Sequence, residues 1–230
     1  AGINIGIERL QTIVDDMIDV SMIDNNLLKL NFQPAQVGQI VAVLRNEVTP
    51  ILQSRKLQIE TSEFEGGRQW IYVDTQRVTQ AIRNVISNAV KYTPDNGKIT
   101  ISGRMLPGFI EVVVEDTGIG ISQEHQSIIF EKFGQVGSVG LHSSGKTKFK
   151  GGGPGLGLSI ARGILEAHGG AIWVESPGYD EKTYPGSTFH ILIPARTESA
   201  DPEMTRLFDT LEKKFKPNVE TNTPTHNTAA

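Results

Sequence analysis

The chain of 230 residues contains no cysteine, so it has no disulfide framework, no thiolate zinc site and no cysteine nucleophile. No apolar run approaches the roughly 18 residues that a membrane-spanning helix needs, and the first residues lack the layout of a signal peptide. The formal net charge is −4, whereas nucleic-acid binders usually present a basic surface. We therefore expect a cytoplasmic segment without membrane contact or nucleic-acid partner, although its parent protein could be membrane-anchored.

Glycine is present but unevenly distributed. Of the 24 glycines, 14 fall between Gly118 and Gly170, which indicates that the backbone there must approach something closely. Within this region, residues 134–153 contain seven glycines together with Lys146, Lys148 and Lys150. A loop of about 20 residues without secondary structure is typical of a lid or of disorder.

Residues 3–30 are predicted to form one helix with a heptad seam. The seam consists of Ile3, Ile7, Leu10, Val14 and Met17. Ile13, Val20 and Leu27 widen the apolar stripe, which suits a helix buried in a bundle. We expect the partner of this helix to be missing or supplied in trans.

From residue 28 onward the hydrophobic pattern alternates between strand and helix periods. It predicts strands at 28–33, 56–62, 70–73, 98–106, 109–116, 171–176 and 187–193, and helices at 35–54, 74–91, 122–133 and 155–168. The tight connection at Pro107-Gly108 implies antiparallel neighbours. The expected fold is a two-layer α/β sandwich, a mixed β-sheet with helices on one face, preceded by one long bundle helix.

The C-terminal part is expected to leave this domain after Pro194. Asp201-Pro202 can start a helix, and an apolar stripe predicts an amphipathic helix within 196–216. Residues 217–230 are rich in Thr and Asn and are predicted to be disordered.

The predicted helix 74–91 carries a polar stripe opposite its apolar face. Gln80, Asn84, Asn88 and Lys91 follow one another at steps of four, four and three. A solvated face is the ordinary interpretation, but asparagine is a weak helix former. Two amide oxygens followed by an ammonium group would suit a cation and a phosphate.

Two glycine motifs follow. After the strand 109–116, Asp116 can accept a hydrogen bond from a ligand, while Gly118 and Gly120 let the backbone approach it. The alternative is a tight turn that precedes a helix at Ser122. Residues 151–158 run into a predicted helix, whose free amides can bind an anion, although a flexible linker is the other interpretation.

Residues 140–147 match the Walker A pattern, but the strand before and the helix after that a P-loop requires are missing. His125 and His142 show no metal-ligand spacing. His168 precedes Gly169-Gly170 and is expected to be a C-terminal helix cap rather than a catalytic base.

Taken together, these motifs resemble the catalytic and ATP-binding domain of two-component sensor histidine kinases, within the GHKL ATPase superfamily. RVTQAIRNVISNAVKYTP is similar to the N box, EDTGIGIS to the first glycine box, IIFEKFGQV to the F box and GGGPGLGLSIARGILEAHGGAIWVES to the second glycine box. Residues 1–30 resemble the second helix of the dimerisation and phosphotransfer hairpin, which leaves 31–195 as the catalytic domain.

The resemblance implies ATP and Mg²⁺ as cofactors and a role for each matching residue. Asn88 would ligate Mg²⁺, and Asn84 and Lys91 would act at the triphosphate as the catalytic residues. Asp116 would accept a hydrogen bond from the adenine amino group, with Thr188 nearby. The other implied nucleotide contacts are Tyr92, Gly118, Gly120, Ile121, Phe133, Lys150, Gly153, Gly155, Leu156, Gly157 and Leu158, with 134–153 as the ATP lid.

The chain departs from the family pattern at three points. None of its histidines has the setting of a phosphoacceptor, so the resemblance implies a fragment whose acceptor lies elsewhere. Gln135 replaces an arginine that often contacts phosphate, so lid charge would come from the nearby lysines. Pro154 replaces a hydroxyl-bearing residue between the glycines.

The implied function is a protein-histidine kinase module that works in a homodimer and delivers phosphate to a response regulator receiver domain. One rival is a GHKL hydrolase, but the position of its water-activating glutamate is Asn84 here. The other is a nucleotide-responsive scaffold without catalysis.

Overall fold

A computed structural model describes residues 2–134, 149 and 154–198. In chain order the helices and strands are α1 (Gly2–Asp24), β1 (Gln33–Gln36), α2 (Val37–Ser54), β2 (Gln58–Thr61), β3 (Trp70–Val73), α3 (Thr75–Tyr92), β4 (Lys98–Leu106), β5 (Phe109–Asp116), η1 (Gln123–His125), η2 (Ile128–Phe130), α4 (Gly157–His168), β6 (Ala171–Glu175) and β7 (Ser187–Pro194). The predicted C-terminal helix and tail lie almost entirely outside the described residues, as does most of the predicted lid.

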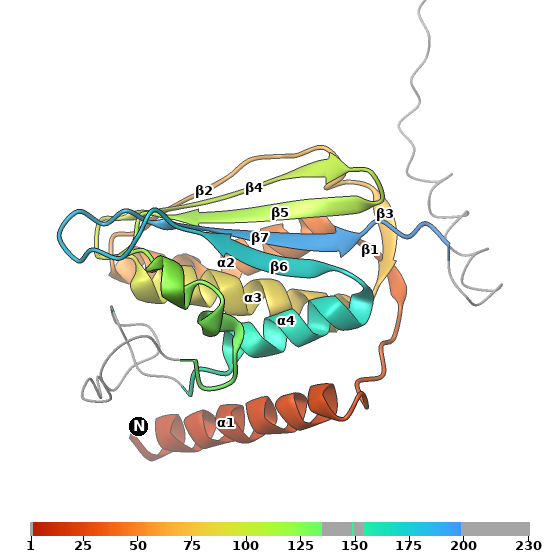
Figure 1. Cartoon of the computed structure of the whole chain (residues 1–230), viewed down its shortest axis with the longest axis horizontal. Helices are drawn as coiled ribbons and strands as arrows, with labels where there is room; N and C mark the ends of the chain where they lie inside the picture. Colours follow the sequence, from red (N-terminus) through yellow and green to blue (C-terminus); the bar gives the residue numbers. More distant parts are fainter. Residues whose placement is uncertain (1, 135–148, 150–153, 199–230) are drawn as a thin grey trace, which may run out of the picture.

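The expected two-layer sandwich is confirmed. Five strands form one mixed sheet in the order β2-β4-β5-β7-β6, in which β2 runs parallel to β4 and the other pairs are antiparallel. The helices α2, α3 and α4 cover one face of this sheet, and α1 lies on the far side of α4 (Figure 1). Alternate residues of the central strands, such as Ile110, Val112 and Val114 of β5, are fully buried against these helices.

The N-terminal helix is shorter than predicted, because it ends at Asp24 rather than near residue 30. Asn26 takes a left-handed conformation with φ of 54°, and the amide of Leu27 bonds to the carbonyl of Met22 at 2.8 Å. This is a helix stop in which asparagine adopts the conformation more often given to glycine. Leu27, which fits the apolar stripe of the helix, had extended the predicted helix past this signal.

The strand predicted at 28–33 is displaced to β1, which pairs antiparallel with β3 in a separate two-stranded sheet. Residues 28–32 form no strand, and the amide of Asn31 donates to the carboxylate of Asp74 at 2.9 Å. The chain therefore passes from α1 to the two-layer sandwich before strand pairing begins.

The helix predicted at 122–133 is wrong, since the segment forms only the two short 3₁₀ turns η1 and η2. Ile129 and Phe130 are adjacent in sequence and both buried. The Gln126 side chain donates to the carbonyls of Ile121 and Ser176, at 3.2 and 2.9 Å. These contacts hold the segment against the loop after β6, and they override its helical pattern.

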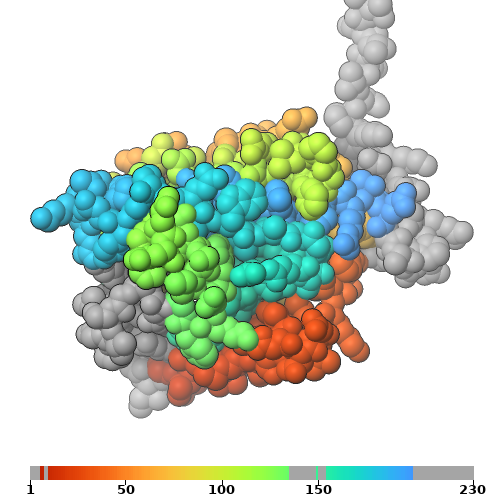
Figure 2. All heavy atoms as spheres, in the orientation of Figure 1, coloured from red at the N-terminus to blue at the C-terminus, as the bar shows by residue number. Residues whose placement is uncertain are grey.

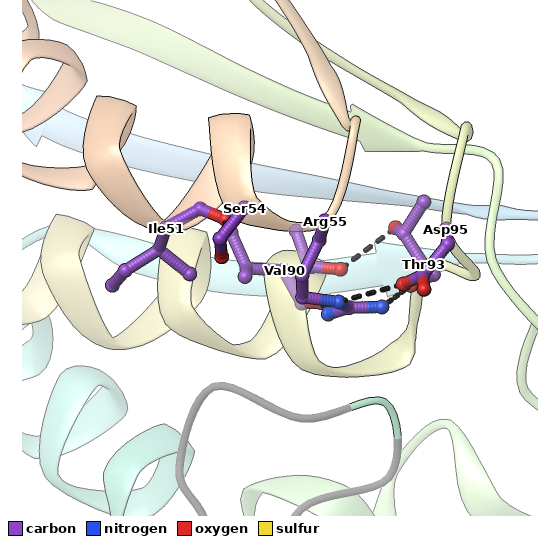
Figure 3. A network of polar contacts seen from close by, with 7 residues as sticks. Ile51, Ser54, Arg55, Val90, Thr93 and Asp95 are labelled. Atoms are coloured by element: carbon purple, nitrogen blue, oxygen red, sulfur yellow. Dashed lines mark hydrogen bonds and ion pairs between the residues drawn. The ribbon is translucent and has the colours of Figure 1, made fainter.

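The end of α3 is fixed by Arg55, the residue that follows α2. Its guanidinium donates to the carbonyls of Val90 and Thr93 and pairs with Asp95 at 2.9 Å (Figure 3). A cation at a helix C-terminus satisfies carbonyls that lack partners within the helix. Arg55 therefore positions the last turn of α3.

His168 ends α4 but does not cap it, because Gly169 does so with φ of 83°. The buried imidazole donates from Nδ1 to the carbonyl of Ile164 at 2.8 Å and accepts from the amide of Asp74 at 3.1 Å. Burial lowers the pKa of His168, which favours this neutral form. The residue joins the end of α4 to the start of α3.

Helix α1 packs against the two-layer sandwich along one side only. Val20 and Ile23 pack against the core, and a Cβ on Gly163 would lie 2.5 Å from the Ile23 side chain. The seam residues Ile7, Leu10, Val14 and Met17 stay more than half exposed. Figure 2 shows α1 in red along the lower edge of the molecule. Within the described part of the chain, no helix is both long and apolar enough to span a membrane.

Candidate functional site

A cavity lies where the second half of α3 meets the end of β5, the start of β7 and the 3₁₀ segment. It encloses about 570 Å³, including the open space at its mouth. It is lined by Asn88, Tyr92, Asp116, Ile119, Gly120, Ile121, Ile129, Gly134, Leu158, Tyr179, Ser187 and Phe189. A concave apolar surface with a few polar groups is the usual form of a small-molecule site.

Asp116 is the buried carboxyl group of this cavity, with 5% of its surface exposed. Burial raises the pKa of Asp116 to about 7, although hydrogen bonds from the amides of Gly118 and Ser187 act in the opposite direction. The Gly118 amide lies 2.8 Å from Oδ1. A carboxyl group held in this way at the base of a cavity can accept a hydrogen bond from a ligand.

The two glycines after Asp116 are required by close backbone contacts. A Cβ on Gly118 would lie 2.5 Å from Asp116 Oδ1 and 2.6 Å from the carbonyl oxygen of Tyr92. Gly120 has φ of 70°, and a Cβ there would lie 2.0 Å from the carbonyl oxygen of Gly178. Of the two, only Gly120 lines the cavity, while Gly118 shapes it from behind.

The residues of the polar stripe of α3 contact three different parts of the molecule: the cavity, the start of α4 and helix α1. Asn88 lines the cavity, and Lys91 Nζ lies 4.8 Å from the centre of the Tyr92 ring, which also lines it. Asn84 instead donates from Nδ2 to the carbonyl of Gly157 at 2.9 Å, and so ties α3 to the first residue of α4. Gln80 contacts Asp19 of α1.

The start of α4 lies beside the cavity, because Leu158 lines it. Gly155 has φ of 74° and precedes the buried Leu156, which has no polar side chain to cap the helix. The first amides of an α-helix have no intrahelical partners, so they can bind an anion. Lys150 and Gly153, which were predicted to lie next to this end, are outside the described residues.

Among the described residues, the predicted contacts that do not line the cavity are Asn84, Lys91, Gly118, Phe133, Gly155, Leu156, Gly157 and Thr188. Thr188 pairs with Glu115 in the β5–β7 register, whereas Ser187 pairs with Asp116 and lines the cavity. Because neighbouring residues of a strand face opposite sides of the sheet, Ser187 rather than Thr188 lies on the cavity side in this structure, and a role for Thr188 stays a prediction. Phe133 is 62% exposed and does not line the cavity.

The sequence reasoning missed five residues that line the cavity, namely Ile119, Ile129, Tyr179, Ser187 and Phe189. The alternation of the predicted strand 187–193 could have placed Ser187 and Phe189 on one face, but not that face beside Asp116, which depends on the β5–β7 pairing. Tyr179 belongs to a loop without periodicity, so no pattern could have indicated it.

The polar groups at the cavity fit a magnesium ion that takes most of its coordination from phosphate oxygens and water and only one ligand from the protein. The described residues contain no group of three or more His, Cys, Asp or Glu side chains arranged to hold a metal. Mg²⁺ often keeps only one or two protein ligands when phosphate oxygens and water supply the others. The amide oxygen of Asn88 is suited to such a role.

Comparisons with known proteins agree with this geometry. Residues 73–197 match the family described as histidine kinase-, DNA gyrase B-, and HSP90-like ATPase. The probable sensor kinase SilS of Salmonella typhimurium is 31% identical over 200 residues, which cover 85% of this chain and 37% of SilS. The chain spans less than half the length of the curated relatives it matches.

Solved structures share the fold. The histidine kinase AdeS of Acinetobacter baumannii has a TM-score of 0.64 and 25% identity, covering 82% of this chain and 80% of that chain. The histidine kinase ThkA in complex with the response regulator protein TrrA has a TM-score of 0.60 and 23% identity, covering 83% of this chain and 48% of that chain.

Proposed function

Because the chain belongs to the family of histidine kinase-, DNA gyrase B- and HSP90-like ATPases, we propose that it is the ATP-binding catalytic module of a sensor protein-histidine kinase. The module would bind ATP with Mg²⁺ and transfer the γ-phosphoryl group to a histidine on a dimerisation helix other than α1. Helix α1 contains no histidine.

The observation that carries the proposal is the meeting of two chemically different ends in one cavity. Asp116 and Ser187 supply polar groups among apolar side chains at one end, which suits a base. Asn88 and the start of α4 supply an amide and free backbone N–H groups, which suit a cation and phosphates.

Each residue then has a separate task. Asp116 would accept from the adenine amino group, while Gly120 and Ile121 would lie against the ring. Asn88 would ligate Mg²⁺, and Lys91 would neutralise phosphate charge. Asn84 would act through its bond to Gly157, which sets the start of α4 and hence the place of the phosphates.

The proposed transfer requires little covalent chemistry from the protein. The bond between the γ-phosphorus and its bridging oxygen breaks, ADP leaves with the electron pair, and a phosphorus–nitrogen bond forms to the imidazole, whose proton passes to solvent. Mg²⁺, when bound, supplies charge neutralisation at the phosphates. The protein residues bind, orient and exclude water, which is the main part of catalysis in phosphoryl transfer.

The hydrolase alternative lacks support at the residue that would have to activate water. Position 84 carries an amide whose nitrogen donates to the carbonyl of Gly157. An amide cannot take a proton from water as a general base does, and such help is typically about 10²–10⁴-fold. We therefore expect slow hydrolysis.

The N-terminal part supports a partner for α1. Its seam residues Ile7, Leu10, Val14 and Met17 are more than half exposed, and an apolar helix face of this kind needs burial against other helices. We propose residues 1–30 as the second helix of the dimerisation hairpin, 31–195 as the catalytic domain with a lid at 134–153, a helix within 196–216 and a disordered tail at 217–230. The proposed downstream partner is a response regulator, as in the ThkA complex.

The test is transfer of radiolabelled γ-phosphate to the dimerisation hairpin of the parent protein, supplied as a separate chain. We expect an acid-labile, alkali-stable label on the acceptor, and none on an acceptor whose histidine is replaced. Rapid phosphate release without labelled acceptor would favour the hydrolase. Tight ATP binding without any turnover would favour the scaffold.

Asn88→Ala should abolish Mg²⁺-dependent binding of a non-hydrolysable ATP analogue in the same preparation. Asn46→Ala is the matched control, since Asn46 is an exposed asparagine on α2 that does not line the cavity. Equal Mg²⁺ dependence in both variants would remove Asn88 from the site.

A further inference from the structure

The loop between β6 and β7, residues 176–186, borders the cavity but has no task in the proposed function. It projects beside the 3₁₀ segment at the left end of the molecule (Figure 2). The amide of Ile121 donates to Ser176 Oγ at 2.9 Å, and that hydroxyl donates to the carbonyl of Gly186 at 2.7 Å. The amide of Asp180 donates to the carbonyl of Ile119 at 2.8 Å. The loop is therefore fastened to the glycine segment after β5.

Tyr179 is the residue of this loop that reaches the cavity. It forms an isolated antiparallel bridge with Gly120, whose missing side chain allows the close approach. Tyr179 lines the cavity, as does Tyr92 on α3. Two aromatic residues from segments far apart in sequence thus contribute to the lining of one cavity.

The conformation of Tyr179 is set before any ligand binds. Its hydroxyl donates to the carboxylate of Glu181, and this bond raises the pKa of Tyr179 to about 12, so the hydroxyl keeps its proton. The Asp180 carboxylate accepts from the amides of Lys182 and Thr183, at 2.7 and 3.3 Å, which stiffens the following turn. A preorganised side chain loses little entropy on binding.

We propose that Tyr179 is an additional base-binding residue of this site, whose ring packs against the purine of the bound nucleotide. The inference rests on the proposed function and assigns different contacts with the base to Asp116 and Tyr179. Asp116 selects the base through a hydrogen bond, while Tyr179 adds affinity through apolar and stacking contact. Tyr179 as a residue is 47% exposed in the free protein, so a flat ligand can cover apolar surface that water now contacts.

The contact is to the base and therefore independent of the phosphate end. Tyr179→Ala should weaken binding of a non-hydrolysable ATP analogue about five- to thirtyfold, the lower part of the range expected for one base-stacking side chain, because the ring stays partly exposed. The factor should be the same with Mg²⁺ and with EDTA, because separated contacts contribute additively. Tyr179→Phe should recover most of the affinity that Tyr179→Ala loses, since it keeps the ring that contacts the base and loses only the bond to Glu181 that orients it.

Tyr184→Ala is the matched control, because Tyr184 belongs to the same loop, is also exposed and does not line the cavity. Calorimetric titration of the four proteins, with thermal melting in the absence of nucleotide, separates binding from folding. Wild-type protein that binds no nucleotide contradicts the proposed function itself. Wild-type protein that binds while Tyr179→Ala binds equally well overturns this inference alone. So does a loss that Tyr184→Ala shares, or one that appears only with Mg²⁺.

Discussion

At the scale of single residues, the pKa of Asp116 gives the site a pH dependence. The pKa rises from 3.8 to about 7 because the carboxyl group is buried. Within this interval the folded state holds a proton that the unfolded state has lost, so the free energy of unfolding falls as the pH rises through it. Nucleotide binding acts in the other direction, because the ionised carboxylate is the better acceptor for an amino group.

The affinity for an ATP analogue should therefore rise about tenfold between pH 6 and pH 8, following the ionised fraction of Asp116. Asp116→Asn removes this titration but keeps an oxygen that can accept the hydrogen bond. Any pH dependence that remains in this variant comes from other groups, such as the phosphates of the ligand. Calorimetric titration of both proteins across this range measures the difference. Parallel pH profiles would show that Asp116 does not titrate in the site.

At the scale of secondary-structure elements, α3 connects α1 with the cavity. Asp19 is 8% exposed and accepts from Arg77 Nη1 and Gln80 Nε2, each at 2.6 Å. Arg77 and Gln80 occupy the first half of α3, while Asn88 and Tyr92 occupy the second half and line the cavity. A second ion pair joins Asp24 of α1 to Lys132 after the 3₁₀ turns.

Asp19→Ala should weaken the docking of α1 by about 1–3 kcal/mol, because it leaves a half-buried guanidinium without its charged partner. Hydrogen exchange in α1 should then be faster, while exchange in α3 and α4 should be unchanged. Asp15→Ala is the control, since Asp15 is exposed on the same helix beside the same arginine. Equal exchange in both variants would mean that apolar packing alone holds α1.

The elements also separate what the sequence can predict from what it cannot. Helix α3 and strands β4 and β5 agree with prediction because their apolar periodicity coincides with their burial. The segment 122–133 has helical composition, but the side-chain bonds of Gln126 and the burial of adjacent Ile129 and Phe130 are tertiary effects. The end of α1 depends on one backbone conformation at Asn26, which a stronger apolar pattern concealed.

The residues of the candidate site likewise fall into those that the sequence indicates and those that it does not. Residues inside the motifs, such as Asn88, Asp116 and Gly120, reach the cavity as a group because each lies within a regular element or close to its end. Ser187 required the register between β5 and β7, which no local pattern encodes. To predict that Tyr179 lines the cavity, the path of an irregular loop would have to be known.

At the scale of the whole molecule, the β5–β7 pairing controls when the cavity can exist during folding. The hairpin of β4 and β5 closes over a short turn, whereas Asp116 meets Ser187 only after the chain between them has been placed. Pairings between residues distant in sequence carry a larger loop-closure cost and usually form late. The base-binding end is thus expected to be absent from the folding transition state.

A bound nucleotide should then slow unfolding and leave the refolding rate unchanged. At about 100 times its dissociation constant, an ATP analogue stabilises the folded state by about 2.7 kcal/mol, which corresponds to unfolding about a hundredfold slower. The refolding rate should not change, because the transition state offers no completed pocket to bind. Stopped-flow fluorescence of Trp70 and Trp173 in urea, with and without the analogue, measures both arms. If the analogue instead accelerates refolding about as much as it was expected to slow unfolding, β7 docks before the rate-limiting step. The nucleotide then binds during folding and does not only stabilise the folded state.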